Sequence, residues 1–332
     1  MQKFMKNRNI LIVAGEPYSV FFEIFFKTLK KKKIQNIKNP IILIGSKKIL
    51  LKQMFRLNYN FKINELLFND INKIKINNKK INILNVNFNY KKTFSKISSK
   101  SNSYINNCCN LALKIVKEKD VKVLINGPIE KKYFLKKKYP GMTEYFAAKV
   151  KKKNEEIMLI YNKNLAVSPL TTHLPLKRIF KKISKKRIIF QVKKINEFYK
   201  KYLKKKPNIA LTGLNPHCET LDKYSEEEKI LSPAIKILNK NNIKISGPFS
   251  ADTIFLKKNY EKYDVIVGMY HDQVLAPLKT LYGFSAINIT IGLPFIRITV
   301  DHGPNNKMIG KNLSSPTSLI EILNFVKNLR DI

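Results

Sequence analysis

Short apolar runs alternate with amphipathic helical segments along most of this 332-residue chain. Runs such as residues 9–14, 122–125 and 263–269 are short and almost entirely apolar, which is typical of strands buried on both faces. A chain that alternates such strands with helices forms a largely parallel sheet with helices on both sides. The sequence therefore predicts the α/β fold class.

The expected elements follow from apolar periodicity and from turn residues. Residues 157–161 and 165–168 are predicted to form a hairpin across the turn at 162–164. Residues 57–103 are rich in Asn, Lys and Ser and predict little regular structure apart from one strand. The predicted strands are 9–14, 40–44, 81–86, 122–125, 157–161, 165–168, 209–211, 263–269, 287–291 and 295–300. The predicted helices are 21–29, 47–55, 104–117, a short one from 143, 175–183, 185–201, 225–238 and 314–329.

The length of the chain predicts two domains, because 332 residues exceed what one hydrophobic core usually serves. No linker or repeat separates them, so the second domain is expected to be inserted into the first. We expect residues 1–140 with 290–332 to form one α/β domain and residues 141–289 to form the other. In parallel sheets of this kind, ligands bind at the carboxyl ends of the strands.

The net charge is +41, and the basic residues that give it are mostly lysines spread along the whole chain. A dedicated DNA-binding protein would concentrate charge on one element and use arginine at base edges. We therefore expect no specific nucleic-acid partner, and we expect the positive field to attract an anionic substrate. Nucleic-acid binding remains an alternative, which predicts affinity that falls steeply with salt.

Cysteine usage and the N-terminus bear on the compartment. Cys108, Cys109 and Cys218 have neither the spacing of a metal site nor an even disulfide framework, which suits a reducing cytosol. The apolar run at 10–14 is too short for a signal sequence or a membrane span. We expect a cytoplasmic protein without a membrane partner.

The four histidines of the chain, His173, His217, His271 and His302, each follow an apolar, strand-like run. Imidazole is a common ligand of divalent metals, and parallel strands bring their carboxyl ends together. The pattern thus predicts a metal site, although no local signature such as HExxH supports it, and hydrogen-bonded structural histidines remain the alternative. Asp252, in the segment "GPFSADTIF", is an acidic residue that could cap a helix or orient one of the histidines.

Several segments together resemble the 4-hydroxythreonine-4-phosphate dehydrogenase family of vitamin B6 biosynthesis. They are "TTHLPLKRI", "GLNPH", "GPFSADTIF", "MYHDQ" followed by "PLK", and "NITIGLPFIRITVDHG", in that order between about residues 120 and 305. The resemblance implies a fold akin to isocitrate and isopropylmalate dehydrogenases. It also implies a homodimer with the active-site cleft between the domains at the dimer interface.

The resemblance implies a role for particular residues. His173, His217 and His271 correspond to the ligands of one divalent ion per subunit, which could be zinc, magnesium or cobalt. The substrate-binding positions correspond to Thr143, Lys279, Asn288 and Arg297. Lys279 and Arg297 suit the anionic ends of a phosphorylated acid. Lys279 and Asp252 are the predicted catalytic residues, with Asp252 supporting a histidine or transferring a proton.

The dinucleotide site is not predicted to be of the Rossmann type, because no GxGxxG follows the first strand. The segment "DHGPNNKMIGKNLSSP" instead resembles the adenosine-binding loop of β-decarboxylating dehydrogenases. Gly303, Gly310, Lys311 and Asn312 are therefore the predicted cofactor-binding residues. The sequence leaves NAD and NADP open, and a plain surface loop is the alternative.

The implied reaction is the NAD(P)-dependent and metal-dependent oxidation of 4-phosphooxy-L-threonine to a β-keto acid that decarboxylates. The chain departs from the family pattern at "PGMTEYF", where Met142 replaces a histidine, and at "GEPYSVFF", "CETLDKYSEEE" and "PIEK". Met142 leaves open a dehydrogenase for threonate or erythronate phosphate. A second alternative is a zinc hydrolase that uses the same three histidines and performs no redox chemistry.

Overall fold

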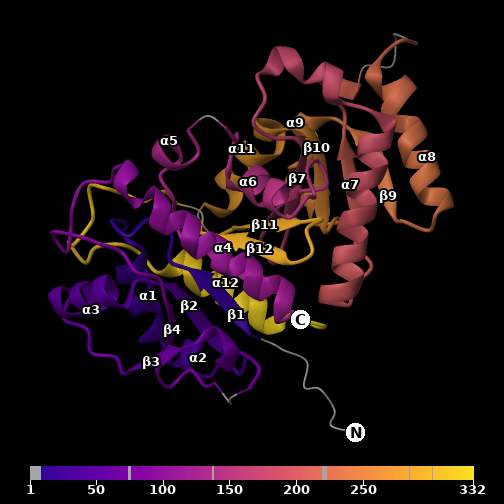
Figure 1. Cartoon of the computed structure of the whole chain (residues 1–332). Helices are drawn as coiled ribbons and strands as arrows, with labels where there is room; N and C mark the ends of the chain where they lie inside the picture. The colour runs from indigo at the N-terminus through magenta and orange to yellow at the C-terminus, as the bar shows by residue number, and fades with distance from the viewer. Residues whose placement is uncertain (1–8, 74–75, 137, 219–222, 284, 301) are drawn as a thin grey trace, which may run out of the picture. The chain divides into compact units, whose positions relative to one another are not determined.

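The computed structural model describes residues 9–73, 76–136, 138–218, 223–283, 285–300 and 302–332, and the chain divides into two compact units (Figure 1). The first unit contains the residues up to 154 together with 293–330 and 332, and the second contains 155–292 and 331. Both units have a sheet flanked by helices, so the predicted α/β class is confirmed.

The strands of the first unit are parallel and lie in the order β3-β4-β2-β1-β5-β12. Ile12 in the centre pairs with Leu43 on one side and with Ile125 on the other, and all three are fully buried. The strands are β1 Ile10–Val13, β2 Ile41–Gly45, β3 Ile63–Leu66, β4 Ile81–Asn85, β5 Val123–Asn126 and β12 Ile296–Thr299.

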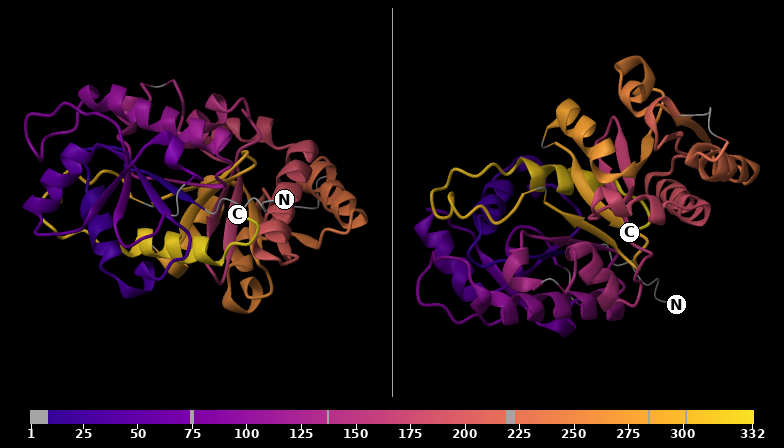
Figure 2. Two further views of the ribbon diagram at one scale, coloured as in Figure 1. Left: turned by 60° about the horizontal axis from the view of Figure 1, so that its bottom comes forward. Right: turned by 90° about the horizontal axis from the view of Figure 1, so that it is seen from above.

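Helices cover both faces of this sheet because its crossover connections run in opposite directions. The connection from β1 to β2 carries α1, whereas the connection from β4 back to β5 carries α4, and right-handed crossovers then place the two helices on opposite faces. Figure 2 (left) shows α4 and α12 on opposite sides of the strands. The helices are α1 Phe21–Leu29, α2 Lys32–Gln35, α3 Lys47–Arg56, α4 Asn102–Glu118, α5 Lys131–Phe134, α6 Met142–Lys149 and α12 Thr317–Asn328.

Helix α6 lies in the first unit, whereas the sequence prediction began the second domain at residue 141. Its side chains bond to that unit: Tyr145 donates from its hydroxyl to Asn106 Oδ1 at 3.1 Å, and Lys149 donates to Asn110 Oδ1 at 3.3 Å. Both partners belong to α4. These contacts depend on residues far apart in the chain, which is why the boundary could not be read from sequence periodicity.

The strands of the second unit lie in the order β11-β6-β7-β10-β8-β9. β7, β10, β8 and β9 are parallel, and β6 is antiparallel to both of its neighbours. β6 and β7 form the predicted hairpin, closed by the Asn162 amide, which donates to the Leu165 carbonyl at 3.2 Å. The strands are β6 Ile157–Tyr161, β7 Ala166–Thr171, β8 Ile209–Thr212, β9 Ile245–Phe249, β10 Val265–Tyr270 and β11 Ile287–Ile291.

The helices of the second unit include two π-helical turns, at Tyr199–Leu203 and Glu227–Leu231. The predicted helix at 175–183 is instead a pair of 3₁₀ turns, Leu176–Arg178 and Phe180–Lys182. Only Ile179 and Ile183 of its apolar side chains are buried, whereas Leu176 and Phe180 are exposed, so packing offers this segment little to stabilise a regular α-helix. The α-helices are α7 Lys185–Phe198, α8 Ser232–Lys240, α9 Ala251–Ile254, α10 Lys257–Tyr260 and α11 His271–Tyr282.

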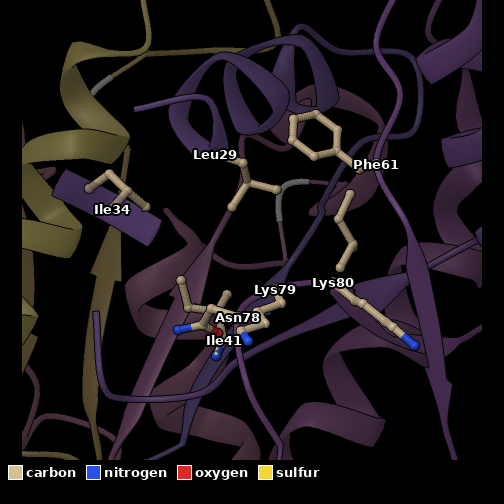
Figure 3. A pocket seen from close by; sticks show the side chains of 8 residues that line it. Leu29, Ile34, Ile41, Phe61, Asn78, Lys79 and Lys80 are labelled. Carbon is tan, nitrogen blue, oxygen red and sulfur yellow. Dashed lines mark hydrogen bonds between the residues drawn. The ribbon is translucent and has the colours of Figure 1, made fainter. Parts of the chain in front are cut away.

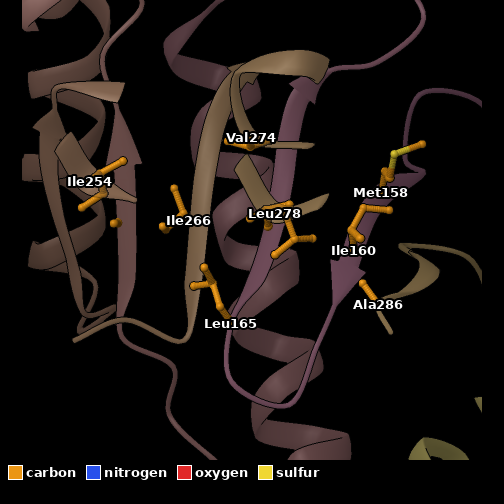
Figure 4. Close-up of a cluster of buried hydrophobic side chains, with 10 residues drawn as sticks. Met158, Ile160, Leu165, Ile254, Ile266, Val274, Leu278 and Ala286 are labelled. Carbon is orange, nitrogen blue, oxygen red and sulfur yellow. The ribbon is translucent and has the colours of Figure 1, made fainter. Parts of the chain in front are cut away.

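Helix α11 packs onto one face of the second sheet and forms a buried apolar cluster there (Figure 4). Val274 and Leu278 of α11 contact side chains of β6, β7 and β10, among them Ile160, Val167 and Ile266. Side chains alternate along a strand, so Val265 and Val267 point to the opposite face. This double coverage explains why β10 is apolar at nearly every position.

No helix in the described ranges has both the length and the apolarity that a membrane span requires.

At Gly268 of β10, helix α11 lies close against the strand. A Cβ atom there would lie 2.3 Å from Val274 Cγ1 and 3.0 Å from Gln273 Oε1. We predict that Gly268→Ala lowers the free energy of unfolding by about 1–3 kcal/mol, because the helix must move to accept the methyl group. Urea denaturation measures this. Gly303→Ala is the matched control, since a Cβ there meets nothing within 4 Å, and an equal loss in both variants would contradict the packing argument.

Candidate active site

The parallel strands of the second unit deliver several predicted site residues to one edge of the sheet. His173 follows β7, His271 follows β10, His217 follows β8, and Asp252 follows β9. These strands are neighbours in the order β7-β10-β8-β9 and run in the same direction, so their carboxyl ends lie along one edge. The candidate metal-binding residues and the candidate acid therefore share the edge where α/β sheets bind ligands.

His173 and His271 lie side by side. Their ring centroids are 6.1 Å apart and the ring planes are tilted by 38°. His271 is the first residue of α11, and its Nδ1 lies 2.6 Å from Asp272 Oδ1. A carboxylate at Nδ1 favours the tautomer that leaves Nε2 as the nitrogen with a free lone pair, as in many metal-binding histidines.

His217 lies in a tight turn that Glu227 organises. His217 has a φ of 54°, in the left-handed region. Glu227 is fully buried, and its Oε1 accepts hydrogen bonds from the amides of Leu214 and Asn215 at 2.7 and 2.9 Å. The pKa of nearby Asp252 is lowered, chiefly by the hydrogen bond from the Ser250 hydroxyl and to a smaller extent by the His217 imidazole.

The spacing of the histidines partly fits a shared metal ion. Two imidazole rings that bind one tetrahedral zinc ion at about 2 Å have their centroids about 5 Å apart. The His173 and His271 centroids, at 6.1 Å, are near that separation but wider than it. Within the described part of the chain, no group of three His, Cys, Asp or Glu residues is close enough to hold an ion. The participation of His217 thus stays a prediction.

Gln273 connects the ends of the two strands that precede His271 and His217. Its Oε1 accepts hydrogen bonds from the Met269 amide at 2.7 Å and from the Thr212 hydroxyl at 2.8 Å, and its Nε2 donates to the Gly213 carbonyl at 2.7 Å. A buried amide that satisfies three partners fixes the local backbone. The sequence prediction missed this role, although the polar residue at a core-facing position of α11 is a usable signal.

Lys279 and Asn288 are not at the edge that carries the histidines. Lys279 comes eight residues after His271 on α11, which places it about 12 Å further along the helix axis. Asn288 is near the start of β11, and its Oδ1 is buried with no hydrogen-bond partner among the described residues. Burial lowers the pKa of Lys279. A partly desolvated cation is suited to bind an anionic group, and an amide oxygen without a donor is suited to a ligand hydroxyl or ammonium group.

Arg297 and Thr143 lie together in the first unit. Arg297 is 2% exposed, and it donates from Nε to Asn126 Oδ1 at 2.8 Å and from Nη1 to Thr143 Oγ1 at 3.0 Å. Its guanidinium also lies over the Phe146 ring, 5.3 Å from the centroid. Burial lowers the pKa of Arg297 to about 10, against the opposing effects of Glu144 and Cys109. Arg297 therefore stays a cation at neutral pH, and it orients Thr143.

Glu16 is a buried carboxyl group directly after β1 that the sequence prediction did not single out. It is 3% exposed, and its Oε1 has no hydrogen-bond partner among the described residues. Burial raises its pKa to about 7, with a smaller contribution in the same direction from Glu130, while hydrogen bonds from the Ser101 hydroxyl and the Tyr18 amide oppose the shift.

The predicted cofactor-binding residues lie in one loop after β12, which we call the 303–314 loop. Gly303, Gly310, Lys311 and Asn312 are exposed there. Gly310 has a φ of +75°, and a Cβ on it would lie 3.1 Å from the Phe94 ring. Asn312 accepts a hydrogen bond at Oδ1 from the Tyr59 hydroxyl at 3.1 Å.

A cavity of about 290 Å³ lies elsewhere in the first unit (Figure 3). It is lined by Leu29, Ile34, Ile41, Phe61, Asn78, Lys79, Lys80 and Ile81. Ile41 and Ile81 are the first residues of β2 and β4, so the cavity is at the amino ends of the strands. Because ligands of parallel sheets bind at the opposite edge, we do not assign this cavity to the active site.

These features define an α/β protein of the dehydrogenase type, with its polar and ionisable residues at the carboxyl ends of parallel strands. The family model for the pyridoxal phosphate biosynthetic protein PdxA matches residues 36–326, and the chain belongs to this family. The resemblance found in the sequence motifs is thereby confirmed.

The relatives of the chain agree with this assignment. A 4-hydroxythreonine-4-phosphate dehydrogenase of Sulfurihydrogenibium sp. (strain YO3AOP1) is 38% identical over 317 residues, which is 94% of this chain and 95% of the relative. A crystal structure of a 4-hydroxythreonine-4-phosphate dehydrogenase from Burkholderia phymatum superposes with a TM-score of 0.82 at 25% identity, covering 98% of this chain and 99% of that one. A protein of Oceanobacillus iheyensis, provisionally named a D-threonate 4-phosphate dehydrogenase, is 30% identical over 94% of this chain and 95% of its own length.

Glu16 should make stability depend on pH. Its pKa rises from 4.5 to about 7 on folding, so the folded chain binds this proton more tightly and stability falls as pH increases between these values. We predict that Glu16→Gln removes this slope and stabilises the protein at pH 8 by at most ~3 kcal/mol. Urea denaturation from pH 4.5 to 8 measures it. Glu118→Gln, at an exposed position, is the control and should keep the wild-type slope; an unchanged slope in Glu16→Gln would refute the assignment.

Proposed function

We propose that this protein oxidises 4-phosphooxy-L-threonine with NAD or NADP to a β-keto acid, which decarboxylates to 3-amino-2-oxopropyl phosphate in vitamin B6 biosynthesis. The observation that carries the proposal is the pairing of His173 and His271 at the ends of neighbouring parallel strands, in a chain of the PdxA family. In the reaction, the C3 hydride goes to the nicotinamide and the hydroxyl proton to a base. Cleavage of the bond to the carboxylate then releases carbon dioxide.

The histidines supply the ligand set for a divalent ion, which could be zinc, magnesium or cobalt. An ion bound by His173, His217 and His271 would lower the pKa of the substrate hydroxyl and stabilise the negative charge that decarboxylation leaves. The Asp272 carboxylate orients His271 through Nδ1. Asp252, which is ionised and close to His217, is positioned to orient that ring or to accept a proton.

The cationic residues supply the substrate-binding groups. Lys279 is a cation in a partly desolvated position, where its attraction for a phosphate or carboxylate is stronger than in water. Arg297 presents a planar guanidinium suited to the same anions, and it positions the Thr143 hydroxyl. Asn288 offers an amide oxygen without a protein donor among the described residues, suited to a substrate hydroxyl or ammonium group. The net charge of +41 attracts such an anionic substrate.

The site is proposed to be completed by a second copy of the chain. His271 and Lys279 are separated by about 12 Å along α11, so one phosphorylated four-carbon acid does not easily bridge both groups within one protomer. In a two-fold symmetric dimer, each protomer can give its histidines to one site and its Lys279 and Asn288 to the other. We therefore infer a homodimer, and we place it in the cytoplasm because Cys108, Cys109 and Cys218 are free thiols.

A related phosphorylated acid is the second candidate substrate. Met142, which replaces the histidine of the family pattern beside Thr143, is 6% exposed and can neither donate a hydrogen bond nor carry charge. Loss of a polar contact at this position would favour threonate or erythronate phosphate, and the Oceanobacillus iheyensis relative carries a name of that kind. Both candidate reactions require NAD or NADP as the hydride acceptor, whereas a zinc hydrolase would not.

The substrate test follows directly. We predict metal-dependent reduction of NAD or NADP with 4-phosphooxy-L-threonine, abolished by a chelator and restored by a divalent ion, measured as absorbance at the nicotinamide band. Threonate and erythronate phosphates are assayed in parallel, and a higher kcat/KM for either would select the second candidate. Turnover without a dinucleotide would indicate hydrolysis, and absence of reduction with all three acids under every metal would refute the proposal.

The dimer test uses mixtures of inactive variants. His173→Asn and Lys279→Met should each abolish activity, whereas an equimolar mixture of the two after subunit exchange should regain about a quarter of wild-type activity, because about half of the dimers are heterodimers and each of these has one intact site. The matched control mixes His173→Asn with His271→Asn, which damages the same half of both sites and should restore nothing. A first mixture that stays inactive after verified subunit exchange would contradict the shared site.

A further inference from the structure

Helix α1 holds the 303–314 loop at both ends. At the start of the loop, the Val20 amide, which precedes the helix, donates to the Pro304 carbonyl at 3.2 Å. At the far end, Lys27 Nζ donates to the carbonyls of Asn312 and Ser314, each at 2.8 Å. Positions 23 and 27 are one helical turn apart and lie on the same face of α1, so the Glu23 and Lys27 side chains reach the far end of the loop together, while the backbone amide at the N-cap contacts its start. Figure 2 (right) shows this yellow loop beside the indigo N-terminal helices.

Glu23 completes the attachment. It is 2% exposed, and its Oε1 accepts hydrogen bonds from Lys27 Nζ at 3.0 Å and from the Ser314 amide. Lys27 thus bonds at once to a buried carboxylate and to two carbonyls that come 285 and 287 residues later in the chain. Hydrogen bonds that involve a charged group are about twice as strong as neutral ones.

The loop has little else to define its conformation. Between Gly303 and Ser314 only Pro304 and Ser314 are buried, and most of the other residues are exposed. The loop's additional contacts with other segments include those of Gly310 with the Phe94 ring and of Asn312 with Tyr59, and within the loop Met308 and Lys311 donate backbone hydrogen bonds to Asn305 and Met308. An exposed loop with few apolar contacts loses much conformational freedom on ordering, and ligand affinity falls when the ligand must provide that ordering.

We propose that Glu23 and Lys27 are positioning residues for the dinucleotide: they hold the 303–314 loop in its binding conformation before the dinucleotide arrives. This inference rests on the proposed function, in which the loop binds the adenosine part of NAD or NADP. Neither residue touches the reacting atoms, so their loss should weaken dinucleotide binding while leaving the chemical step and the affinity for the phosphorylated acid largely intact.

The test compares Lys27→Met with wild type and with Lys31→Met, which removes an exposed positive charge just beyond the same helix. Isothermal titration calorimetry with NAD and with NADP measures dinucleotide binding without turnover, and steady-state kinetics separates the KM for dinucleotide, the KM for the acid and kcat. We expect Lys27→Met to raise the dinucleotide Kd and KM about tenfold or more and to change the other two constants less than twofold. Lys31→Met should match wild type.

Hydrogen exchange provides the second readout. Amides of the 303–314 loop should exchange faster in Lys27→Met than in wild type, and Lys27→Arg should recover part of both the protection and the affinity. Wild type that binds neither dinucleotide would refute the proposed function and this inference with it. Wild-type affinity in Lys27→Met, or an equal loss of affinity for dinucleotide and acid, would overturn the inference alone.

Discussion

The parallel alignment of β7, β10 and β8 is the constraint on which the candidate metal site depends. His173, His217 and His271 are separated by 44 and 54 residues in the sequence, and only the common direction of these strands brings their ends to one edge. Gln273 reinforces that alignment, because its amide bonds to backbone or side-chain groups at the ends of both β10 and β8. The chemistry proposed for the histidines is thus a consequence of strand direction and of one buried amide.

In the first unit, the constraint is the hydrogen bonding of buried polar and charged side chains. Its central strands are apolar and buried, so every polar side chain among them must be satisfied internally. Arg297 donates to Asn126 and Thr143, and one carboxylate oxygen of Glu23 accepts from Lys27 and the Ser314 amide, while its other oxygen has no partner among the described residues. Glu16 is satisfied only in part, and its raised pKa is the energetic result. Several functional candidates of this unit are therefore found among its buried polar residues.

Much of the fold could be predicted from the sequence because most strands are fully buried and appear as continuous apolar runs. Two strands were missed, β3 and β9, and both are at sheet edges. β3 includes Asn64 and Glu65, and β9 includes Gly247 and Pro248, so neither has the apolar pattern of a central strand. Partly solvated edges tolerate such residues, which removes the signal that periodicity analysis requires.

For the candidate site, the sequence predicts where the histidines lie but not which residues support them. The position of each histidine after an apolar run indicates a strand end, and strand ends of parallel sheets are where ligands bind. The sequence does not show that Lys27 bonds to carbonyls almost 290 residues away, or that Gln273 joins two strand ends. These roles depend on tertiary proximity between residues whose types are unremarkable in themselves. The separation of Lys279 from His271 along α11 likewise becomes apparent only once the helix limits are known.

We propose that imidazoles from three strand ends bind one ion. X-ray absorption spectroscopy of the zinc-loaded or cobalt-loaded protein counts imidazole ligands directly through their outer-shell scattering. We expect three imidazoles per bound ion, falling to two in each of His173→Asn, His217→Asn and His271→Asn. A wild-type ion with one imidazole or none, or a count that the three substitutions leave unchanged, would contradict it.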